Sequence, residues 1–524
     1  MLPLLKLNRK LLGLWLSVFL LSSIIFFFLS EKSIRWLNSD AFYYYVIGWN
    51  SSGFTLSYDS IYATTGIHPL WQIIILILNV FLWNSSDLYL AIVLGLCTTF
   101  LIIALFNLWT IVKMYNKHAW FIVLFPSYWL VFGLLSDAQY GNLFTYINGM
   151  ESALSLFLLI YTIKILVHAT NQGYNRFSIR LGVFSFLTVL SRLDLLPVVC
   201  ILLLLPFYKS RIKPRVLFLQ LIFPFSAMGL FLLYSRLSGG SFLPSSWIIK
   251  LGTSANLDWN LKNLGEILLG PKTVAYGGTL LSRHFQVLIP IVVFLIFTFS
   301  RFFANRVSRR STLKVTWAEL VFFVGLGISA RGFIIYRQEN IWNQGNWYFF
   351  DGVIYVQVLL NICLYLVLKR LIKVKLSVLL VVLVVVSNLF FLSTRSNSSF
   401  NQEYLDVWSS REAICTSLEA LTLKDCSSIS FAEFDDGIVA YALRGKNFNA
   451  LGLAVDTKAA WEIKNGNLAK LLDSRCYFYY ASVNYQELDS GILTNIARPG
   501  DEILNLDGLW VLVRNKASLP SFCT

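Results

Sequence analysis

Residues 38–71 read NSDAFYYYVIGWNSSGFTLSYDSIYATTGIHPLW, a polar and aromatic stretch rich in turn-forming residues. It follows the apolar segment 11–29, so Asp40 stands where the chain would leave the hydrocarbon of a bilayer. A carboxylate there is available for chemistry at the membrane surface, with three consecutive tyrosines (43–45) behind it. Tyrosine and tryptophan also gather at headgroup depth without any catalytic role. The stretch therefore predicts an extracytoplasmic loop that is either functional or simply interfacial.

Composition predicts an α-helical polytopic membrane protein. Of the 524 residues, 56% are hydrophobic and only 14% charged, and the mean hydropathy is +0.64, whereas soluble domains carry about 25% charged residues. The net charge of +15 reflects topology rather than a nucleic-acid partner, because six short segments hold 20 of the Lys and Arg residues and no Asp or Glu. Basic loops between apolar spans face the cytoplasm. These loops are 1–10, 113–118, 171–180, 208–215, 301–314 and 369–375.

About 20 apolar residues span a bilayer, and the apolar segments predict about eleven crossings. The N-terminus is expected in the cytoplasm of a plasma (inner) membrane protein, with 11–29 as an uncleaved signal anchor because it has no small-residue cleavage site. We interpret 67–83 as a juxtamembrane or partly inserted helix, and 181–207 as two short helices with a charged apex. The other predicted crossings are 88–112, 119–135, 152–169, 216–236, 285–300, 316–335, 348–368 and 376–392.

This topology predicts a membrane module over 1–392, with a first outer loop at 31–87 and a large outer loop at 237–284. The tail, 393–524, is predicted to be an extracytoplasmic α/β domain. Its apolar spacing indicates a helix over Val407–Leu423. Strands are expected in SISFAEFDDGIVAYAL (428–443), CYFYYASVNY (476–485) and GLWVLVR (508–514).

The seven cysteines divide by position. Cys97, Cys200 and Cys363 lie in apolar spans, where they are expected to pack. The tail holds the other four, and an even number there suggests up to two disulfides in an oxidising compartment, with three possible connectivities. These candidates are Cys415, Cys426, Cys476 and Cys523.

Ionisable residues next to apolar spans are functional candidates, because hydrocarbon penalises charge. Glu151 (in NGMESAL), Arg192 and Asp194 (in SRLD), Lys250 (in GSFLPSSWIIK) and Arg331 all fall on the predicted outer side with Asp40. Each also has a plain structural reading. A carboxylate suits a helix start, Arg192 and Asp194 could neutralise one another, and a lysine can snorkel at the interface.

Aromatic and imidazole side chains supply further binding candidates. The rings of Tyr44, Trp347 and Tyr348 could stack on a sugar, although an interfacial belt explains them equally well. His68 could contact a ligand, but no second histidine stands at metal-ligand spacing, so packing is the alternative. The sequence contains no Walker loop, dinucleotide fingerprint, HExxH or paired CxxC motif.

Several of these stretches together resemble the GT-C glycosyltransferases, in particular bacterial multi-pass members of the protein-mannosyltransferase and aminoarabinose-transferase type. The likeness is carried by Asp40 with its tyrosines, by TGIHPLW (65–71) and by GMESAL (149–154). Two positions depart from the family pattern. Ser39 replaces the first acid of a usual pair, and Gly48-Trp49-Asn50 lacks an arginine.

The resemblance implies transfer of a sugar from a polyprenyl-phosphate donor to a lipid, glycan or protein acceptor on the outer face, with inversion. Asp40 would act as the base, and Glu151 would orient the acceptor or share a divalent cation with Asp40. The donor phosphate would meet Arg192, Lys250 and Arg331. Two alternatives remain open on the residues themselves: a transporter or lipid-linked-sugar flippase with charges lining a path, and a non-catalytic assembly protein.

Overall fold

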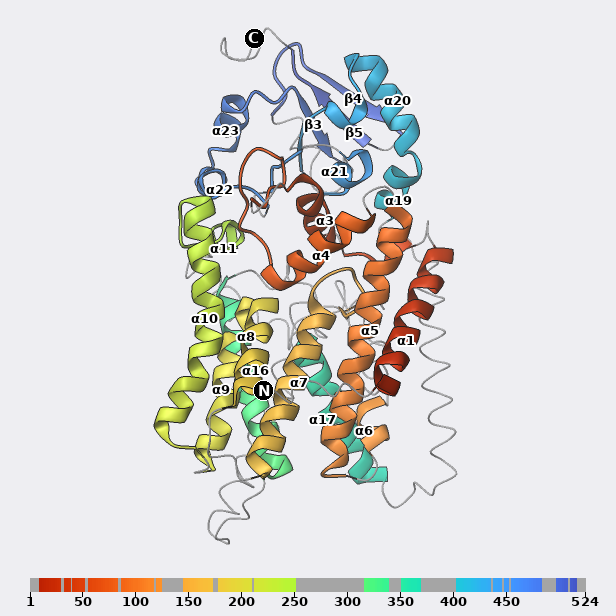
Figure 1. Ribbon diagram of the computed structural model, residues 1–524. Coiled ribbons are helices and arrows are strands. Elements are labelled where there is room, and N and C mark those ends of the chain that lie inside the picture. The colour runs from red at the N-terminus through yellow and green to blue at the C-terminus, as the bar shows by residue number, and fades with distance from the viewer. Residues whose placement is uncertain are drawn as a thin grey trace, which may run out of the picture. The chain divides into compact units, whose positions relative to one another are not determined.

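The computed structural model is mostly helical, with one five-stranded sheet formed by C-terminal residues (Figure 1). The structure describes residues 9–29, 33–38, 40–51, 55–82, 86–116, 119–124, 145–172, 178–209, 212–250, 315–338, 350–368, 402–434, 437–444, 447–451, 454–482, 496–507 and 509–515.

Four described helices are long and apolar enough to cross a membrane, and each coincides with a predicted crossing. They are α5 (Ser86–Lys113), α7 (Ser152–Asn171), α10 (Pro214–Gly239) and α16 (Trp317–Gln338). Further apolar helices are α1 (Arg9–Phe28), α4 (Pro69–Leu82), α6 (Ala119–Leu124), α8 (Ile179–Ser191), α9 (Leu196–Tyr208) and α17 (Phe350–Leu368). The total of eleven crossings stays a prediction, because 125–135, 285–300 and 376–392 lie outside the described residues.

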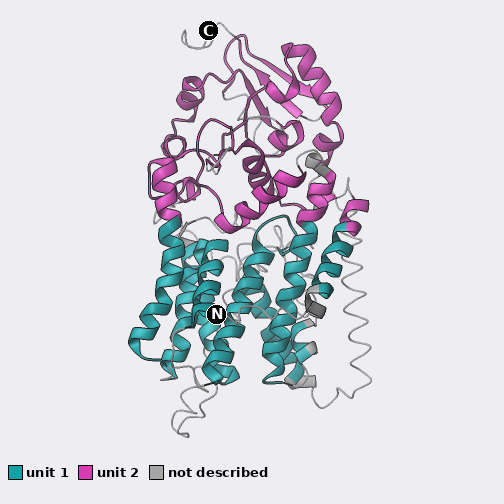
Figure 2. Cartoon of the chain, viewed as in Figure 1, with its two compact units in different colours: residues 1–23, 94–230, 252–397 teal, residues 24–93, 231–251, 398–524 magenta. Residues whose placement is uncertain are grey.

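The chain forms two compact units, each assembled from three separate stretches (Figure 2). Unit 1 comprises residues 1–23, 94–230 and 252–397, and unit 2 comprises 24–93, 231–251 and 398–524. The residues of the predicted first outer loop thus belong to the same unit as the tail.

In unit 1, the predicted break within 181–207 is confirmed. Helices α8 and α9 meet at a short 3-10 turn, η5 (Leu193–Leu195), because Arg192 is extended (φ −158°, ψ 111°) and cannot continue α8. Helix α9 then packs closely along α16 (Figure 1). Gly327 permits this approach, since a Cβ there would lie 3.0 Å from the Val198 Cα.

In unit 2, the sheet has the order β2-β1-β3-β5-β4, parallel across its first three strands and antiparallel across the rest. Its core contains Tyr480 and Leu512 from the strands, Ala459 from a covering helix, and Ile248 from the distant segment 231–251. The strands are β1 (Phe431–Glu433), β2 (Phe448–Asn449), β3 (Tyr479–Ser482), β4 (Glu502–Leu506) and β5 (Leu509–Val513). The helices are η1 (Ile34–Trp36), α3 (Ala41–Asn50), α11 (Ser245–Lys250), α19 (Gln402–Ser409), α20 (Arg411–Thr422), η8 (Cys426–Ser428), α21 (Ile438–Leu443), α22 (Thr457–Lys464) and α23 (Leu468–Ser474).

The helix expected over 407–423 is present apart from a break at Ser410, which separates α19 from α20. One local prediction for the tail is wrong. The strand expected over 428–443 ends after β1, and its second half is α21. Gly437 makes the change of direction with φ +92°, and the Glu433 Oε2 accepts the Ala440 N–H in the first turn of α21.

The tail cysteines are at least partly oxidised. Cys415 and Cys426 form a disulfide that links α20 to η8. Cys476 is also disulfide-bonded, and Cys523 lies outside the described residues. Cys97 is free and buried in α5.

Candidate functional site

Five charged side chains from separate stretches of unit 1 form one continuous ion-pair cluster. The Arg192 Nη1 donates to the Glu151 Oε1 at 3.0 Å, and its Nε donates to the Asp194 Oδ1 at 3.1 Å. The Arg331 Nη2 donates to the Asp194 Oδ2 at 2.9 Å, while its Nη1 donates to Asp351. Asp194 therefore joins the two arginines, and each arginine reaches a further carboxylate.

Four of the five cluster residues lie at or beside helix ends, and the fifth lies within a helix. Glu151 directly precedes α7 and Asp351 lies in the first turn of α17, both positions that the helix dipole favours for an acid. Arg192 and Asp194 occupy the break between α8 and α9. Arg331 comes from the body of α16. The cluster consequently ties five helices of unit 1 together.

Burial makes the balance of charge in this cluster important. Side-chain exposure is 0% for Glu151, 2% for Arg192, 1% for Arg331 and 2% for Asp351, and only Asp194 reaches 16%. Removing such ions from water costs several kcal/mol each unless partners and hydrogen bonds compensate. Among the described residues, three carboxylates compensate the charges of two guanidinium groups in this cluster.

The aromatic ring of Phe350 completes the cluster. The guanidinium carbons of Arg192 and Arg331 lie 5.7 and 5.1 Å from its centroid, within cation–π range. The Tyr146 hydroxyl holds this residue by donating to its carbonyl at 2.9 Å. The ring thus covers both arginines while the carboxylates neutralise them.

Sequence reasoning selected four of the five cluster members individually, and the structure brings those four together. It missed Asp351, which directly follows the aromatic segment 331–350. The rule that ionisable residues beside apolar spans are functional candidates would also have selected this acid. Among the described residues, no group of three or more His, Cys, Asp or Glu side chains is placed to hold a metal ion.

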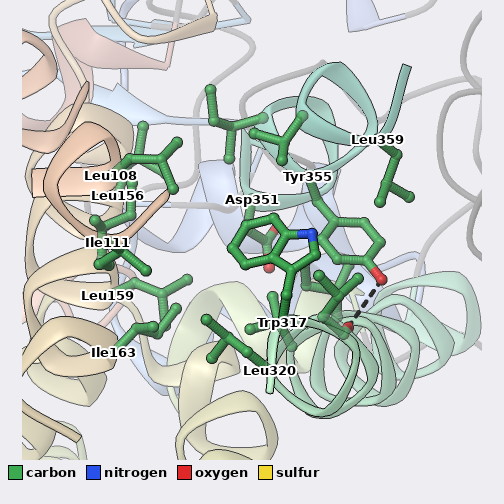
Figure 3. Close-up of a pocket in the computed structure, with 16 residues that line it drawn as sticks. Leu108, Ile111, Leu156, Leu159, Ile163, Trp317, Leu320, Asp351, Tyr355 and Leu359 are labelled. Atoms are coloured by element: carbon green, nitrogen blue, oxygen red, sulfur yellow. Dashed lines mark hydrogen bonds between the residues drawn. The ribbon is translucent and has the colours of Figure 1, made fainter. Parts of the chain in front are cut away.

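An apolar pocket adjoins the cluster inside unit 1 (Figure 3). Its described walls come from α5, α7, α16 and α17. Figure 3 shows leucine and isoleucine side chains of α5 and α7 on one side, Trp317 and Tyr355 on the other, and Asp351 between them. Asp351 is therefore shared by the ion-pair cluster and the pocket wall.

In unit 2, Asp40 immediately precedes α3 and is half-buried. Its backbone N–H donates to the Asn38 Oδ1 at 2.9 Å, and its carboxylate makes no capping hydrogen bond to α3. Residues 41–48 of this helix are all buried. Tyr44, one of the buried residues, stacks on His68 with ring centroids 6.4 Å apart. His68 thus packs against the helix that Asp40 starts.

Helix α3 is fixed by an aromatic cage around Tyr441 of α21. Phe42, Tyr45 and Trp49 occupy one face of α3, and their ring centroids lie 5.2, 5.7 and 4.7 Å from that of Tyr441. Trp408 of α19 stacks on the other side at 5.3 Å. Aromatic pairs at such distances contribute about 0.5–1.5 kcal/mol beyond their area burial. Tail residues therefore hold the helix that follows Asp40.

Polar contacts attach the rest of the first loop to the tail. The Tyr58 hydroxyl donates to the fully buried Glu433, whose other oxygen accepts from the Asn447 side chain at 2.8 Å. Arg475 pairs with Asp59 at 3.7 Å and also with Asp456. The loop is thus bound to the tail through a buried carboxylate and a shared arginine.

The remaining predicted residues fall as follows. Lys250 ends α11 and is half-buried in unit 2. Trp347 and Tyr348 lie outside the described residues. Asp40 belongs to unit 2 and Glu151 to unit 1, so the cation that they were expected to share stays a prediction.

Fold and site together define a helical membrane protein with a buried ion-pair cluster and an aromatic loop bound to an α/β tail. No protein-family model and no curated protein matches the chain. Among solved structures, the chain is similar to the archaeal oligosaccharyltransferase AglB from Archaeoglobus fulgidus, solved in complex with an inhibitory peptide and a dolichol-phosphate. The TM-score is 0.40 and the identity 12%, over 98% of this chain and 76% of that chain. A TM-score this low does not establish a shared fold or activity.

Proposed function

We propose that this protein is a membrane glycosyltransferase that moves a sugar from a polyprenyl-phosphate donor to an acceptor hydroxyl on the outer face of the membrane, with inversion. One observation carries the proposal. Glu151, Arg192, Asp194 and Arg331, selected from motifs that resemble those of GT-C glycosyltransferases, converge on one buried cluster.

Asp40 is proposed as the general base. A neutral alcohol is a poor nucleophile, and a positioned carboxylate that takes its proton contributes roughly 10²–10⁴-fold to the rate. The half-buried position at the start of a fixed helix suits this role, because the carboxylate is held by a rigid element and keeps access to a substrate. Attack of the alcohol oxygen on the anomeric carbon breaks the bond to the phosphate in one displacement.

The leaving phosphate is already charged, so it requires cations rather than a general acid. Arg192, Lys250 and Arg331 are the proposed cations. Both arginines also donate to carboxylates of the cluster.

The test is an in vitro transfer assay. Purified full-length protein in detergent receives radiolabelled polyprenyl-phosphate sugars and a membrane-lipid extract as acceptor, with and without EDTA. Asp40→Asn is expected to abolish turnover, whereas Asp425→Asn, an exposed acid in the tail, serves as the matched control. Near wild-type turnover in Asp40→Asn would remove Asp40 from the mechanism. Failure of every donor to bind would instead favour a transporter.

A further inference from the structure

Two cations lie near one another at the end of unit 1 that is opposite the ion-pair cluster. Lys164 lies in α7 thirteen residues after Glu151, which is about 20 Å along the helix at a rise of 1.5 Å per residue. Arg180 is in the first turn of α8, and its charge is near enough to act on that of Lys164. The basic loops 113–118 and 171–180 adjoin this end, so we predict that it faces the cytoplasm.

Lys164 is half-buried, and its ammonium group is held by a neutral side chain. The Lys164 Nζ donates to the Asn107 Oδ1 of α5 at 2.9 Å, and the Asn107 Nδ2 donates to the Ile103 carbonyl at 2.8 Å. Lysines near helix ends commonly extend toward the head groups, whereas this one reaches across to α5, two turns before α7 ends at Asn171. Charge beside hydrocarbon is unfavourable without an opposite charge, and an amide does not supply one.

Arg180 is exposed, and an aromatic side chain rather than an acid holds it. The Arg180 Nη2 donates to the Tyr161 hydroxyl, and its guanidinium carbon lies 5.4 Å from the centroid of that ring. Tyr161 precedes Lys164 by three residues, so both lie on one face of α7. Within the described part of the chain, neither Lys164 nor Arg180 pairs with an Asp or Glu side chain.

The donors that remain on these two side chains suit a phosphate group. Lys164 has three N–H donors and Arg180 has five, and the neutral side chains of Asn107 and Tyr161 each accept from one of them. A phosphate offers the missing opposite charge, which lysine binds as a point charge and arginine binds through its planar fork. The dipole of α8 also disfavours a cation in the first turn and favours an anion there. The pair of cations therefore indicates an anionic ligand.

The surface next to the cations, on the side away from the basic loops, is aromatic and apolar. Phe157 precedes Tyr161 by one turn of α7, and Phe184 follows Arg180 by one turn of α8. Their ring centroids lie 5.9 and 4.6 Å from that of Tyr161, and both side chains are only half-buried. Such a surface accepts hydrocarbon chains, which a lipid carries and a soluble phosphate does not.

We propose that Lys164 and Arg180 bind the phosphate of an anionic phospholipid from the cytoplasmic leaflet, with its acyl chains against Phe157 and Phe184. Basic sites between transmembrane helices on the cytoplasmic side are a known means of binding anionic head groups. The site shares no residue with the proposed donor site and goes beyond glycosyl transfer. Its test measures binding alone, so failure of this proposal leaves the proposed function unaffected.

The experiment titrates the full-length protein in a non-ionic detergent with single lipids and counts bound lipids by native mass spectrometry. The two lipid probes are phosphatidylglycerol, which is anionic, and phosphatidylcholine with the same acyl chains, which is zwitterionic. The first phosphatidylglycerol is expected to bind roughly tenfold more tightly than the first phosphatidylcholine, corresponding to about 1.4 kcal/mol. Glycerol 1-phosphate, a phosphate ester without acyl chains, should not bind at concentrations at which phosphatidylglycerol saturates the site.

Variants separate a specific site from general attraction to a positive surface. Lys164→Gln/Arg180→Gln should reduce the affinity for phosphatidylglycerol to that for phosphatidylcholine. Lys213→Gln/Arg215→Gln removes two exposed cations beside α10, on the same predicted side, and should leave the preference unchanged. Lys164→Arg keeps the charge at the half-buried position and should retain the preference. Arg180→Gln alone changes an exposed residue, which guards against misfolding, and should weaken phosphatidylglycerol binding several-fold.

Four results would overturn the proposal. Equal affinity for the two lipids in the wild-type protein would mean that no anionic head group is selected. A preference that persists in Lys164→Gln/Arg180→Gln would place the lipid elsewhere. An equal loss of preference in Lys213→Gln/Arg215→Gln would attribute the binding to overall positive charge. Binding of glycerol 1-phosphate as tightly as phosphatidylglycerol would assign the two cations to a soluble phosphate ester.

Discussion

Two tyrosine-to-phenylalanine substitutions in unit 2 should change stability in opposite directions. The Tyr441 hydroxyl is buried in the aromatic cage and finds no hydrogen-bond partner within the described residues. The Tyr58 hydroxyl is also buried, but it donates to the Glu433 carboxylate. Both substitutions remove one oxygen atom from a buried ring of the same size. Their difference therefore isolates the hydrogen bond.

The magnitudes follow from the environments of the two hydroxyl groups. A buried polar group without a partner costs about 1–3 kcal/mol, so Tyr441→Phe should stabilise the protein by about 1 kcal/mol. Tyr58→Phe deprives a buried carboxylate of a donor and should destabilise by about 1–3 kcal/mol. Tyr441→Ala removes the whole ring from between Trp49 and Trp408 and should cost about 3–5 kcal/mol, as large-to-small aromatic substitutions do.

The assay is thermal unfolding of the full-length protein in detergent, followed by intrinsic tryptophan fluorescence. The midpoint should rise for Tyr441→Phe and fall for Tyr58→Phe and Tyr441→Ala. If both phenylalanine variants shifted the midpoint in the same direction, the assignment of the two hydroxyls would be wrong. An unchanged midpoint in Tyr441→Ala would show that the cage does not contribute to the cooperative unit that melts.

Tyr441→Phe should also change how the unfolding midpoint depends on pH in alkaline solution. Burial, followed by the nearby charge of Asp87, raises the pKa of the Tyr441 hydroxyl well above its ordinary value of about 10. The unfolded chain then releases this proton at a lower pH than the folded chain does. Stability linked to Tyr441 is thus complete below about pH 10 and is lost as the pH rises beyond it. Tyr441→Phe should remove this component from the decline of the midpoint above pH 10.

Three further predictions concern other contacts. Asp194→Asn should lower the unfolding midpoint by the equivalent of about 1–3 kcal/mol, because one amide oxygen cannot replace both carboxylate oxygens that accept from the two buried arginines; a midpoint within error of wild type would contradict the cluster. Gly437→Ala should impair folding, measured as the yield of monodisperse protein, because φ is +92° and a Cβ would lie 2.9 Å from the Tyr58 hydroxyl; normal yield would show that the turn relaxes. Dithiothreitol should lower the midpoint by about 2–3 kcal/mol equivalent through the Cys415–Cys426 disulfide. Cys415→Ser should lose this part of the response and keep the part that comes from the disulfide of Cys476.

The fold could be predicted where local composition decides it. The four long helices follow from continuous apolar runs, and the break at Arg192 follows from charges placed between two basic loops. The tail was harder, because the residues of α21 are all apolar or aromatic and fit a strand as well as a helix. The hydrogen bond from the Ala440 N–H to Glu433 and the positive φ of Gly437 decide the outcome, and neither is visible as a period in the sequence.

In the candidate site, too, local sequence identifies single residues but not the contacts between them. The cost of charge near hydrocarbon marks Glu151, Arg192, Asp194 and Arg331 one at a time. Their pairing depends on how α7, α8, α9 and α16 pack, which a single sequence does not specify. Asp351 was not selected from the sequence, because it directly follows the aromatic segment 331–350, which was interpreted as a source of sugar-stacking rings. A pairwise contact is therefore what the structure adds to a list of residues.

The contacts of unit 2 bear on how the tail could influence any reaction at Asp40. The composition changes from apolar to polar near residue 392, but unit 2 contains residues from both sides of that change. Tyr441 of the tail packs against three aromatic residues of α3, and Glu433 of the tail accepts a hydrogen bond from the Tyr58 hydroxyl. Without the tail, α3 would expose its aromatic face. Without the loop, Glu433 of β1 would be buried without the hydrogen bond from Tyr58. The loop and the tail are accordingly expected to fold together. A substitution in the tail can then alter chemistry at Asp40 by moving α3, without the tail touching a substrate.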